Sequence, residues 1–129
     1  MVDFSLIYDT YHRIHQHLVE TTLLESSFLS NRLNKRVLIK AECLQKTGSF
    51  KYRGSWSSFV NNDIEDLKRG VISYSSGNHA QGIAAVANQL KIQATIIMPK
   101  DAPRLKIKNT QSYGCLLYTS DAADEEDSV

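Results

Sequence analysis

Three basic side chains surround one glycine turn in the stretch CLQKTGSFKYRG, which begins at Cys43. The cations are Lys46, Lys51 and Arg53, and the stretch contains no Asp or Glu. A lysine becomes a nucleophile when burial or a neighbouring cation lowers its pKa and leaves the amine neutral. Phe50, directly before Lys51, can supply an apolar wall. The pattern allows a reactive amine at Lys51, but on composition alone a solvated lysine is much the commoner meaning of this position.

A second stretch, SSGNH over residues 75–79, combines small and polar residues that suit an anion. It joins a predicted strand to a predicted helix, at the carboxyl end of the strand where open α/β sheets bind ligands. Free N–H groups at a helix start attract anions, and Ser76 and Asn78 add neutral hydrogen-bonding groups. A tight turn with Ser and Asn as capping residues is an alternative of equal weight.

Hydrophobic periodicity predicts the elements that position these stretches. Ile7, Tyr11, Ile14 and Leu18 recur at helical spacing and predict an amphipathic helix. The next predicted elements are a strand over 36–42, a helix over 50–61 capped by Ser49, and a short helix over 63–69. A regular βαβα unit follows: strand 71–75, helix 79–90, strand 94–98 and helix 104–113. The expected fold class is α/β, a parallel sheet with flanking helices.

Residues 115–129 depart from this pattern. CLLYTS can form a third parallel strand, but the last nine residues contain five acids and no helix start. A solvated acidic terminus is the common meaning of such a run. The residues CLLYTSDAADE also resemble the translation, in one frame, of a transposase-type sequencing adapter. We favour the second interpretation, so residues 115–129 are expected to be non-native sequence, poorly ordered after about Ser120.

Taken together, the two stretches resemble the threonine/serine dehydratase family of pyridoxal-phosphate enzymes. The likeness runs from about Thr22 to Gly114 and is carried by KAECLQKTGSFKYRG, SSGNHAQGIA, LLESSFLS and IIMPKDAP. It implies the tryptophan-synthase-β-like fold, called fold type II. By this resemblance, residues 1–60 belong to the larger domain of that fold and residues 61–114 to the smaller βαβα domain.

The resemblance also implies roles for individual residues. Lys51 matches the lysine that forms a Schiff base with pyridoxal 5′-phosphate, and its freed amine would take the α-proton of the substrate. Asn78 matches the residue that hydrogen-bonds the pyridoxal 3-hydroxyl, with Phe50 beside the cofactor. The substrate carboxylate would be bound by Ser76, Gly77, Asn78 and His79. Ser76 also matches the position that acts as an acid/base on the opposite face in serine racemases.

The implied activity is conversion of L-threonine or L-serine to a 2-oxo acid and ammonia. Serine racemase and 3-hydroxyaspartate dehydratase are the alternatives, and a non-enzymatic α/β fragment is the competing class. Thr21-Thr22 stands where the family commonly has Thr-Pro. The six glycines are all isolated, so the glycine-rich phosphate loop of the family is missing. The chain is therefore expected to be the inactive N-terminal part of an enzyme.

Composition limits the partners and the compartment. A net charge of +1 and an apolar fraction of 42% indicate neither a nucleic-acid partner nor a membrane-spanning segment. The expected partner is a small amino-acid substrate, and the whole protein is expected to be a homo-oligomer. Two cysteines without a CxxC pair, and an N-terminus without signal-peptide order, predict a cytoplasmic location.

Weaker candidates carry no predicted chemistry. His12, His15 and His17 could bind a metal, but His12 and His15 share a helix face that His17 leaves. No Cys or carboxylate completes a site there, so we expect a solvated helix face and no metal. Cys43 is expected to be a small core residue.

Overall fold

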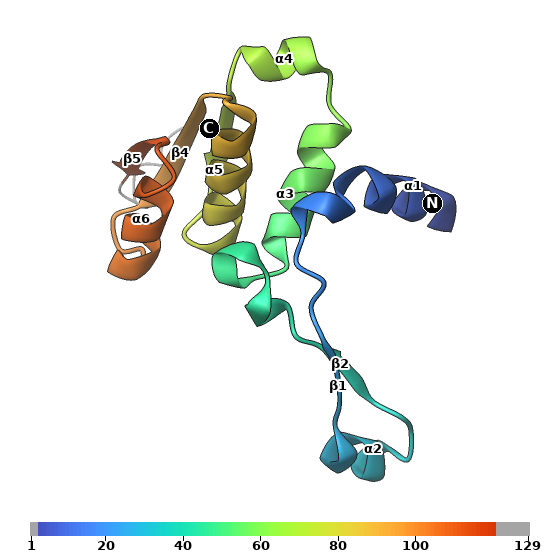
Figure 1. The fold of residues 1–129 in the computed structure, drawn as a ribbon. Helices are drawn as coiled ribbons and strands as arrows, with labels where there is room; N and C mark the ends of the chain where they lie inside the picture. Colours follow the sequence, from blue (N-terminus) through green and yellow to red (C-terminus); the bar gives the residue numbers. More distant parts are fainter. Residues whose placement is uncertain (1–2, 121–129) are drawn as a thin grey trace, which may run out of the picture.

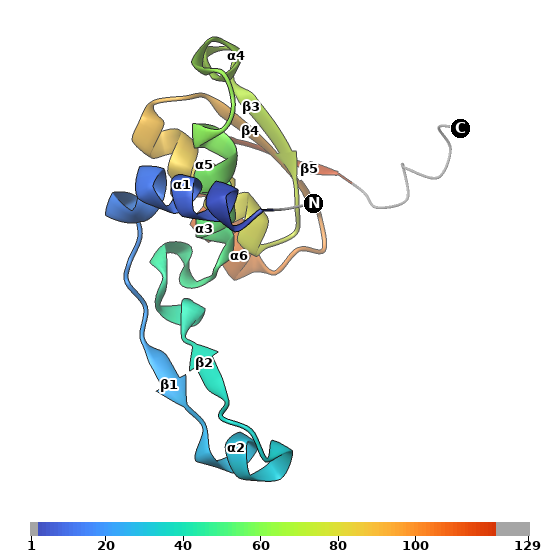
Figure 2. The same ribbon diagram turned by 90° about the vertical axis from the view of Figure 1, so that its right-hand side faces the viewer.

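A computed structural model describes residues 3–120. A body of helices and a parallel sheet carries a narrow projecting arm, seen from two sides in Figures 1 and 2. The helices are α1 (Phe4–Ile14), α2 (Ser27–Leu33), α3 (Lys51–Val60), α4 (Ile64–Lys68), α5 (Asn78–Leu90) and α6 (Arg104–Gln111). Three 3₁₀ turns are η1 (His15–His17), η2 (Glu42–Leu44) and η3 (Lys46–Gly48). The strands are β1 (Leu23–Glu25), β2 (Leu38–Lys40), β3 (Val71–Tyr74), β4 (Ala94–Pro99) and β5 (Leu116–Ser120).

The predicted βαβα unit is confirmed, and β5 adds a third parallel strand. The strand order is β3-β4-β5, so β4 lies in the centre. Ala94, Ile96 and Met98 of β4 are buried under α5. The opposite sheet face stays open among the described residues, where Ile72 is 77% exposed and Tyr118 is 58% exposed. Apolar side chains thus lie on both faces of the sheet, but α5 and α6 cover one.

Close contact between α3 and α5 forms the centre of the body (Figure 2). Tyr52, Trp56 and Phe59 of α3 are buried against the alanine-rich middle of α5. A Cβ added at Gly82 would lie 2.5 Å from Ser55 Oγ and 3.2 Å from the carbonyl oxygen of Lys51. A glycine at this position therefore lets the two helices approach one another near the start of α3.

The arm consists of β1, α2 and β2 (Figure 1). β1 and β2 pair antiparallel, with Leu24 opposite Ile39. Ser26 caps α2 through Leu29 N–H at 3.3 Å, and Asn34 ends the helix in the left-handed conformation, with φ of 49°. The predicted strand over 36–42 shrinks to Leu38–Lys40, and β1 and α2 were not predicted.

Cys43 is exposed, which corrects the expectation that it lies in the core. It belongs to the 3₁₀ turn η2, where the chain leaves the arm and none of the three residues is buried. The acidic residues from 121 onward, and the disorder expected of them, lie outside the described residues. Within residues 3–120, none of the helices has the length and apolar composition needed to cross a membrane.

Candidate active site

Lys51 is the first residue of α3 and follows a sharp turn. Thr47 and Gly48 both have positive φ, 64° and 70°, and they reverse the chain directly before the helix. The Lys51 side chain is exposed, with Nζ 5.3 Å from the centroid of the Phe50 ring. Lys51 forms no ion pair with any carboxylate among residues 3–120. The turn therefore presents an exposed amine beside an aromatic ring at the start of α3.

Ser49 does not cap α3, contrary to the sequence prediction. The cap position falls on Phe50, which has helical φ and ψ of −61° and −16° and makes no side-chain capping bond. The Ser49 hydroxyl is buried and has no partner among the described residues. The prediction was wrong because α3 begins at Lys51, one residue later than a Ser49 cap requires.

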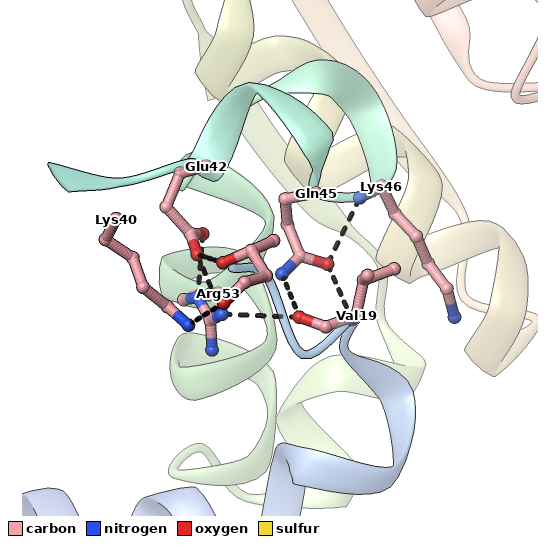
Figure 3. A network of polar contacts seen from close by, with 7 residues as sticks. Val19, Lys40, Glu42, Gln45, Lys46 and Arg53 are labelled. Carbon is pink, nitrogen blue, oxygen red and sulfur yellow. Dashed lines mark hydrogen bonds and ion pairs between the residues drawn. The ribbon is translucent and has the colours of Figure 1, made fainter. Parts of the chain in front are cut away.

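The sequence suggested that Arg53 is a free cation beside Lys51. In the structure, Arg53 is instead paired with a carboxylate. Its Nε lies 2.7 Å from Glu42 Oε2, and its terminal nitrogen lies 2.8 Å from Oε1 (Figure 3). Thr21 Oγ1 donates to the same carboxylate at 2.5 Å. The hydrogen bonds from Arg53 are the main reason that the pKa of Glu42 is lowered to about 2. The acid lies just before the cationic stretch, which is why that stretch looked unpaired in the sequence.

Gln45 and Lys46 anchor the same stretch to the chain after α1. The Gln45 side chain accepts from Val19 N–H and donates to Val19 carbonyl oxygen, both at 2.9 Å (Figure 3). Lys46 Nζ donates to the His17 carbonyl at 2.8 Å. These contacts tie the turn before Lys51 to the segment that follows α1.

The SSGNH stretch forms the start of α5, as predicted. Ser75 Oγ accepts from Gly77 N–H at 3.2 Å and tightens the turn after β3. Gly77 occupies the cap position without a side-chain capping bond, and the first turn of α5 contains no acidic residue. The first N–H groups of a helix have no intrahelical partner. Ser76, Asn78 and His79 are exposed around these groups.

The structure brings Lys51 and the start of α5 together. Desolvation lowers the pKa of His79, and the positive charge of Lys51 lowers it further. The α3–α5 contact at Gly82 lies one helical turn beyond His79. The exposed amine and the uncapped helix start therefore lie at one place in the molecule.

Sequence reasoning missed Lys106, which reaches this place from α6. Its Nζ donates a hydrogen bond to Asn78 Oδ1. The signal available in the sequence was a lysine in the first turn of a helix predicted to flank the same sheet. That position gives no indication of which neighbouring helix the side chain will contact.

The histidines near α1 do not share one environment. His12 and His15 lie on one face, with ring centroids 6.1 Å apart. The ring of His17 stacks on Trp56, with centroids 3.8 Å apart, and the residue is half-buried. The expectation that His17 is solvated is therefore wrong. Burial is the main reason that the pKa of His17 is lowered.

Comparison with known proteins identifies the family. A family model described as pyridoxal-phosphate dependent enzyme matches residues 14–129. The chain belongs to this family. It is 40% identical over 120 residues to an L-threo-3-hydroxyaspartate ammonia-lyase of Saccharomyces cerevisiae, a match that covers 89% of the chain and 37% of the relative. An L-threonine ammonia-lyase of Thermotoga maritima is 47% identical over 94 residues, covering 73% of the chain and 23% of the relative.

Solved structures in the family share the fold. The structure of maize serine racemase superposes with a TM-score of 0.86 at 35% identity, covering 96% of this chain and 38% of that one. The expected fold type II architecture, with a parallel sheet and flanking helices, is thereby confirmed. The chain spans 37% and 33% of the length of two ammonia-lyases of 3-hydroxyaspartate, and 23% of the L-threonine ammonia-lyase.

Proposed function

We propose that the protein to which this chain belongs is an ammonia-lyase that converts L-threonine or L-serine to a 2-oxo acid and ammonia. One observation carries the proposal: an exposed lysine amine without a carboxylate partner among residues 3–120 lies beside the uncapped start of α5. An amine next to free N–H groups suits a ligand with both an aldehyde and negatively charged oxygens.

The residues present fit the carbonyl end of pyridoxal phosphate. Lys51 Nζ is the group that would hold the cofactor covalently, with Phe50 beside it. Asn78 would donate to the 3-hydroxyl oxygen, because its own amide oxygen already accepts from Lys106. Bound at this place, the cofactor supplies an electron sink for the bonds at the substrate Cα.

The chain's own groups would bind the substrate and move its proton. The N–H groups at Asn78 and His79 would bind the substrate carboxylate, since the start of α5 has no acidic side chain to compete and the Gly77 N–H already donates to Ser75 Oγ. Lys51 Nζ, once released, would take the proton from Cα. The β-hydroxyl of the same substrate would then leave as water, and hydrolysis of the resulting enamine would give the 2-oxo acid and ammonia.

Two alternatives rest on the same site. A serine racemase requires a second proton carrier, and Ser76 Oγ is exposed next to the start of α5. A 3-hydroxyaspartate ammonia-lyase would need a cation for the second carboxylate of its substrate. Similarity to racemases and to both kinds of ammonia-lyase favours the shared chemistry at Cα over any single substrate.

Lys51 is tested by covalent trapping. The chain is mixed with pyridoxal phosphate, reduced with borohydride and digested, and the modified lysine is identified by mass spectrometry. We expect modification of Lys51 before Lys46, and loss of the lysine-bound cofactor absorbance in Lys51→Ala but not in Lys46→Ala. In the whole protein, Lys51→Ala should also abolish ammonia release. Equal modification of both lysines in the whole protein would reject the assignment.

The extent of the protein is a separate proposal. We propose that residues 1–60 and 61–114 belong to two domains of a homo-oligomeric cytoplasmic enzyme, and that residues 115–129 are not native. Support for the last point is the adapter-like sequence itself. Independent sequence reads across the codon of Gly114 test it: a reproducible CLLYTSDAADEEDSV continuation would contradict the proposal.

A further inference from the structure

Lys106 has a different environment from every other lysine in the chain. All nine lysines lie in the described residues, and Lys106 alone is partly buried while the other eight are exposed. Its backbone N–H donates to the Pro103 carbonyl at 2.8 Å, and its carbonyl accepts from the buried Thr110 hydroxyl at 2.8 Å. The base of this side chain is therefore fixed at the first turn of α6.

The partner of Lys106 is a neutral amide. Its Nζ donates to Asn78 Oδ1, and it forms no ion pair with a carboxylate among residues 3–120. A cation near a helix N-terminus is electrostatically unfavourable, because the helix dipole is positive there. Local electrostatics alone therefore does not account for a half-buried lysine at this position.

The chemistry of lysine fixes the orientation of the Asn78 amide. An ammonium group has three donors and no acceptor, so it can bind the amide oxygen but not the amide nitrogen. The Asn78 side chain must then turn Oδ1 toward α6 and leave Nδ2 to face another group. Without such a partner, an exposed amide can rotate and present either its donor or its acceptor.

We infer that Lys106 is a positioning residue that holds Asn78 as a hydrogen-bond donor toward the 3-hydroxyl oxygen of pyridoxal phosphate. The inference rests on the proposed function, which places that oxygen at Asn78. A donor at this position stabilises the deprotonated oxygen, because hydrogen bonds to a charged form favour that form. Lys106 acts on the cofactor through Asn78, so removing Asn78 should remove its effect.

The test is a pH titration of the absorbance of the cofactor bound to the chain, in three variants. Lys106→Met removes the donor, Lys106→Arg retains one, and Lys108→Met makes the same change of charge on an exposed position of α6. We expect Lys106→Met to raise the apparent pKa of the bound 3-hydroxyl by about one unit, and the other two variants to leave it near the wild-type value. Lys106→Met should add nothing further in an Asn78→Ala background.

Two results would overturn the inference. One is an identical titration for Lys106→Met and Lys108→Met. The other is an equal Lys106→Met effect with and without Asn78, which would show a direct action of the charge. If Lys106→Met does not fold, Asn78→Asp is used in its place. The carboxylate introduced by this change keeps an acceptor for Lys106 but has no N–H to donate to the cofactor. It should raise the same pKa, and a wild-type titration would overturn the inference.

A cofactor-free measurement separates this inference from the proposed function. The side-chain Nδ2–H resonances of Asn78, identified by their loss in Asn78→Ala, are compared by NMR. They should shift in Lys106→Met and remain in place in Lys108→Met; unchanged resonances in Lys106→Met would overturn the inference. A chain that shows the resonance shift but binds no cofactor at Lys51 contradicts the proposed function while the contact between Lys106 and Asn78 stands.

Discussion

At the scale of single residues, the turn before Lys51 depends on one charged pair. Glu42 and Arg53 are largely shielded from solvent, with 16% and 28% of their side chains exposed. Two hydrogen bonds join them, and Thr21 satisfies the same carboxylate. A pair with this geometry and partial burial contributes more to stability than an exposed one.

The pair should make stability depend on acid pH. The pKa of Glu42 falls from 4.5 to about 2 on folding, so the folded state binds its proton less readily than the unfolded state. The resulting stabilisation is complete above pH 4.5 and is lost as the pH falls through about 2. Glu42→Gln should lower the free energy of unfolding at pH 7 by about 2 kcal/mol, allowing for solvent screening.

Urea denaturation between pH 7 and pH 2 measures this difference. The control is Glu25→Gln, which breaks the exposed pair with Arg36, whose side chains are 51% and 71% exposed. Its effect should be close to zero at all pH values. A Glu42→Gln deficit that persists unchanged at pH 2 would mean that the charge of Glu42 is not its cause.

At the scale of elements, the contact between α3 and α5 sets the distance from Lys51 to the start of α5. Helices that touch near a glycine can approach more closely than helices that carry side chains there. Ser55 Oγ fills part of the space at Gly82 and donates to the Lys51 carbonyl at 3.0 Å. A larger residue at 82 would therefore displace α3 at the position of its reactive lysine.

Gly82→Ala should destabilise the protein by about 2 kcal/mol, because the added Cβ would lie 2.5 Å from Ser55 Oγ. The matched control is Gly54→Ala in α3, where an added Cβ meets nothing within 4 Å. That change should stabilise the helix by up to about 1 kcal/mol. Thermal unfolding compares the two variants. Equal effects would show that helix propensity, and not the close approach, determines the outcome.

The regular elements could be predicted from the sequence where one pattern governs each. The predicted helix over 79–90 and strand over 94–98 match α5 and β4 to within one residue. The arm could not be predicted, because its strands are three residues long and carry apolar residues on both faces. Such strands give neither alternation nor length as a signal.

The candidate site could be predicted as two stretches but not as a set of contacts. The family resemblance indicated Lys51 and Asn78. The partner Glu42 lies within the same motif but was given no role, and Lys106 lies outside the motifs. Side-chain pairing between separate elements depends on how those elements pack. Local sequence does not encode it.

At the scale of the whole molecule, much apolar surface remains open. Ile72, Tyr74, Leu116 and Tyr118 form exposed rows across the outer face of the sheet. The arm adds Leu24, Phe28 and Ile39, each at least 45% exposed. Parallel sheets are normally covered on both faces, and contiguous apolar patches mark sites of association.

The chain of 129 residues should therefore associate with itself as its concentration rises. Ile72→Lys should reduce this association and the binding of a hydrophobic dye, since it replaces the most exposed apolar side chain of the patch with a charge. Leu105→Lys is the control, because Leu105 is 67% exposed on α6 and lies outside the patch. Size-exclusion chromatography with light scattering tests both. A wild-type chain that stays monomeric at high concentration would contradict the prediction.

Two hydrogen bonds between Gln45 and Val19 form a bridge that allows the attachment of the arm to be measured by hydrogen–deuterium exchange. Gln45 is 3% exposed, and its amide pairs with both backbone groups of Val19 as another peptide unit would. The Val19 amide proton can exchange with deuterium when this bridge opens. The exchange rate of the Val19 amide proton therefore measures how often the base of the arm separates from the turn before Lys51. In Gln45→Leu that proton should exchange at the rate of an unprotected amide, while those of β4 stay slow.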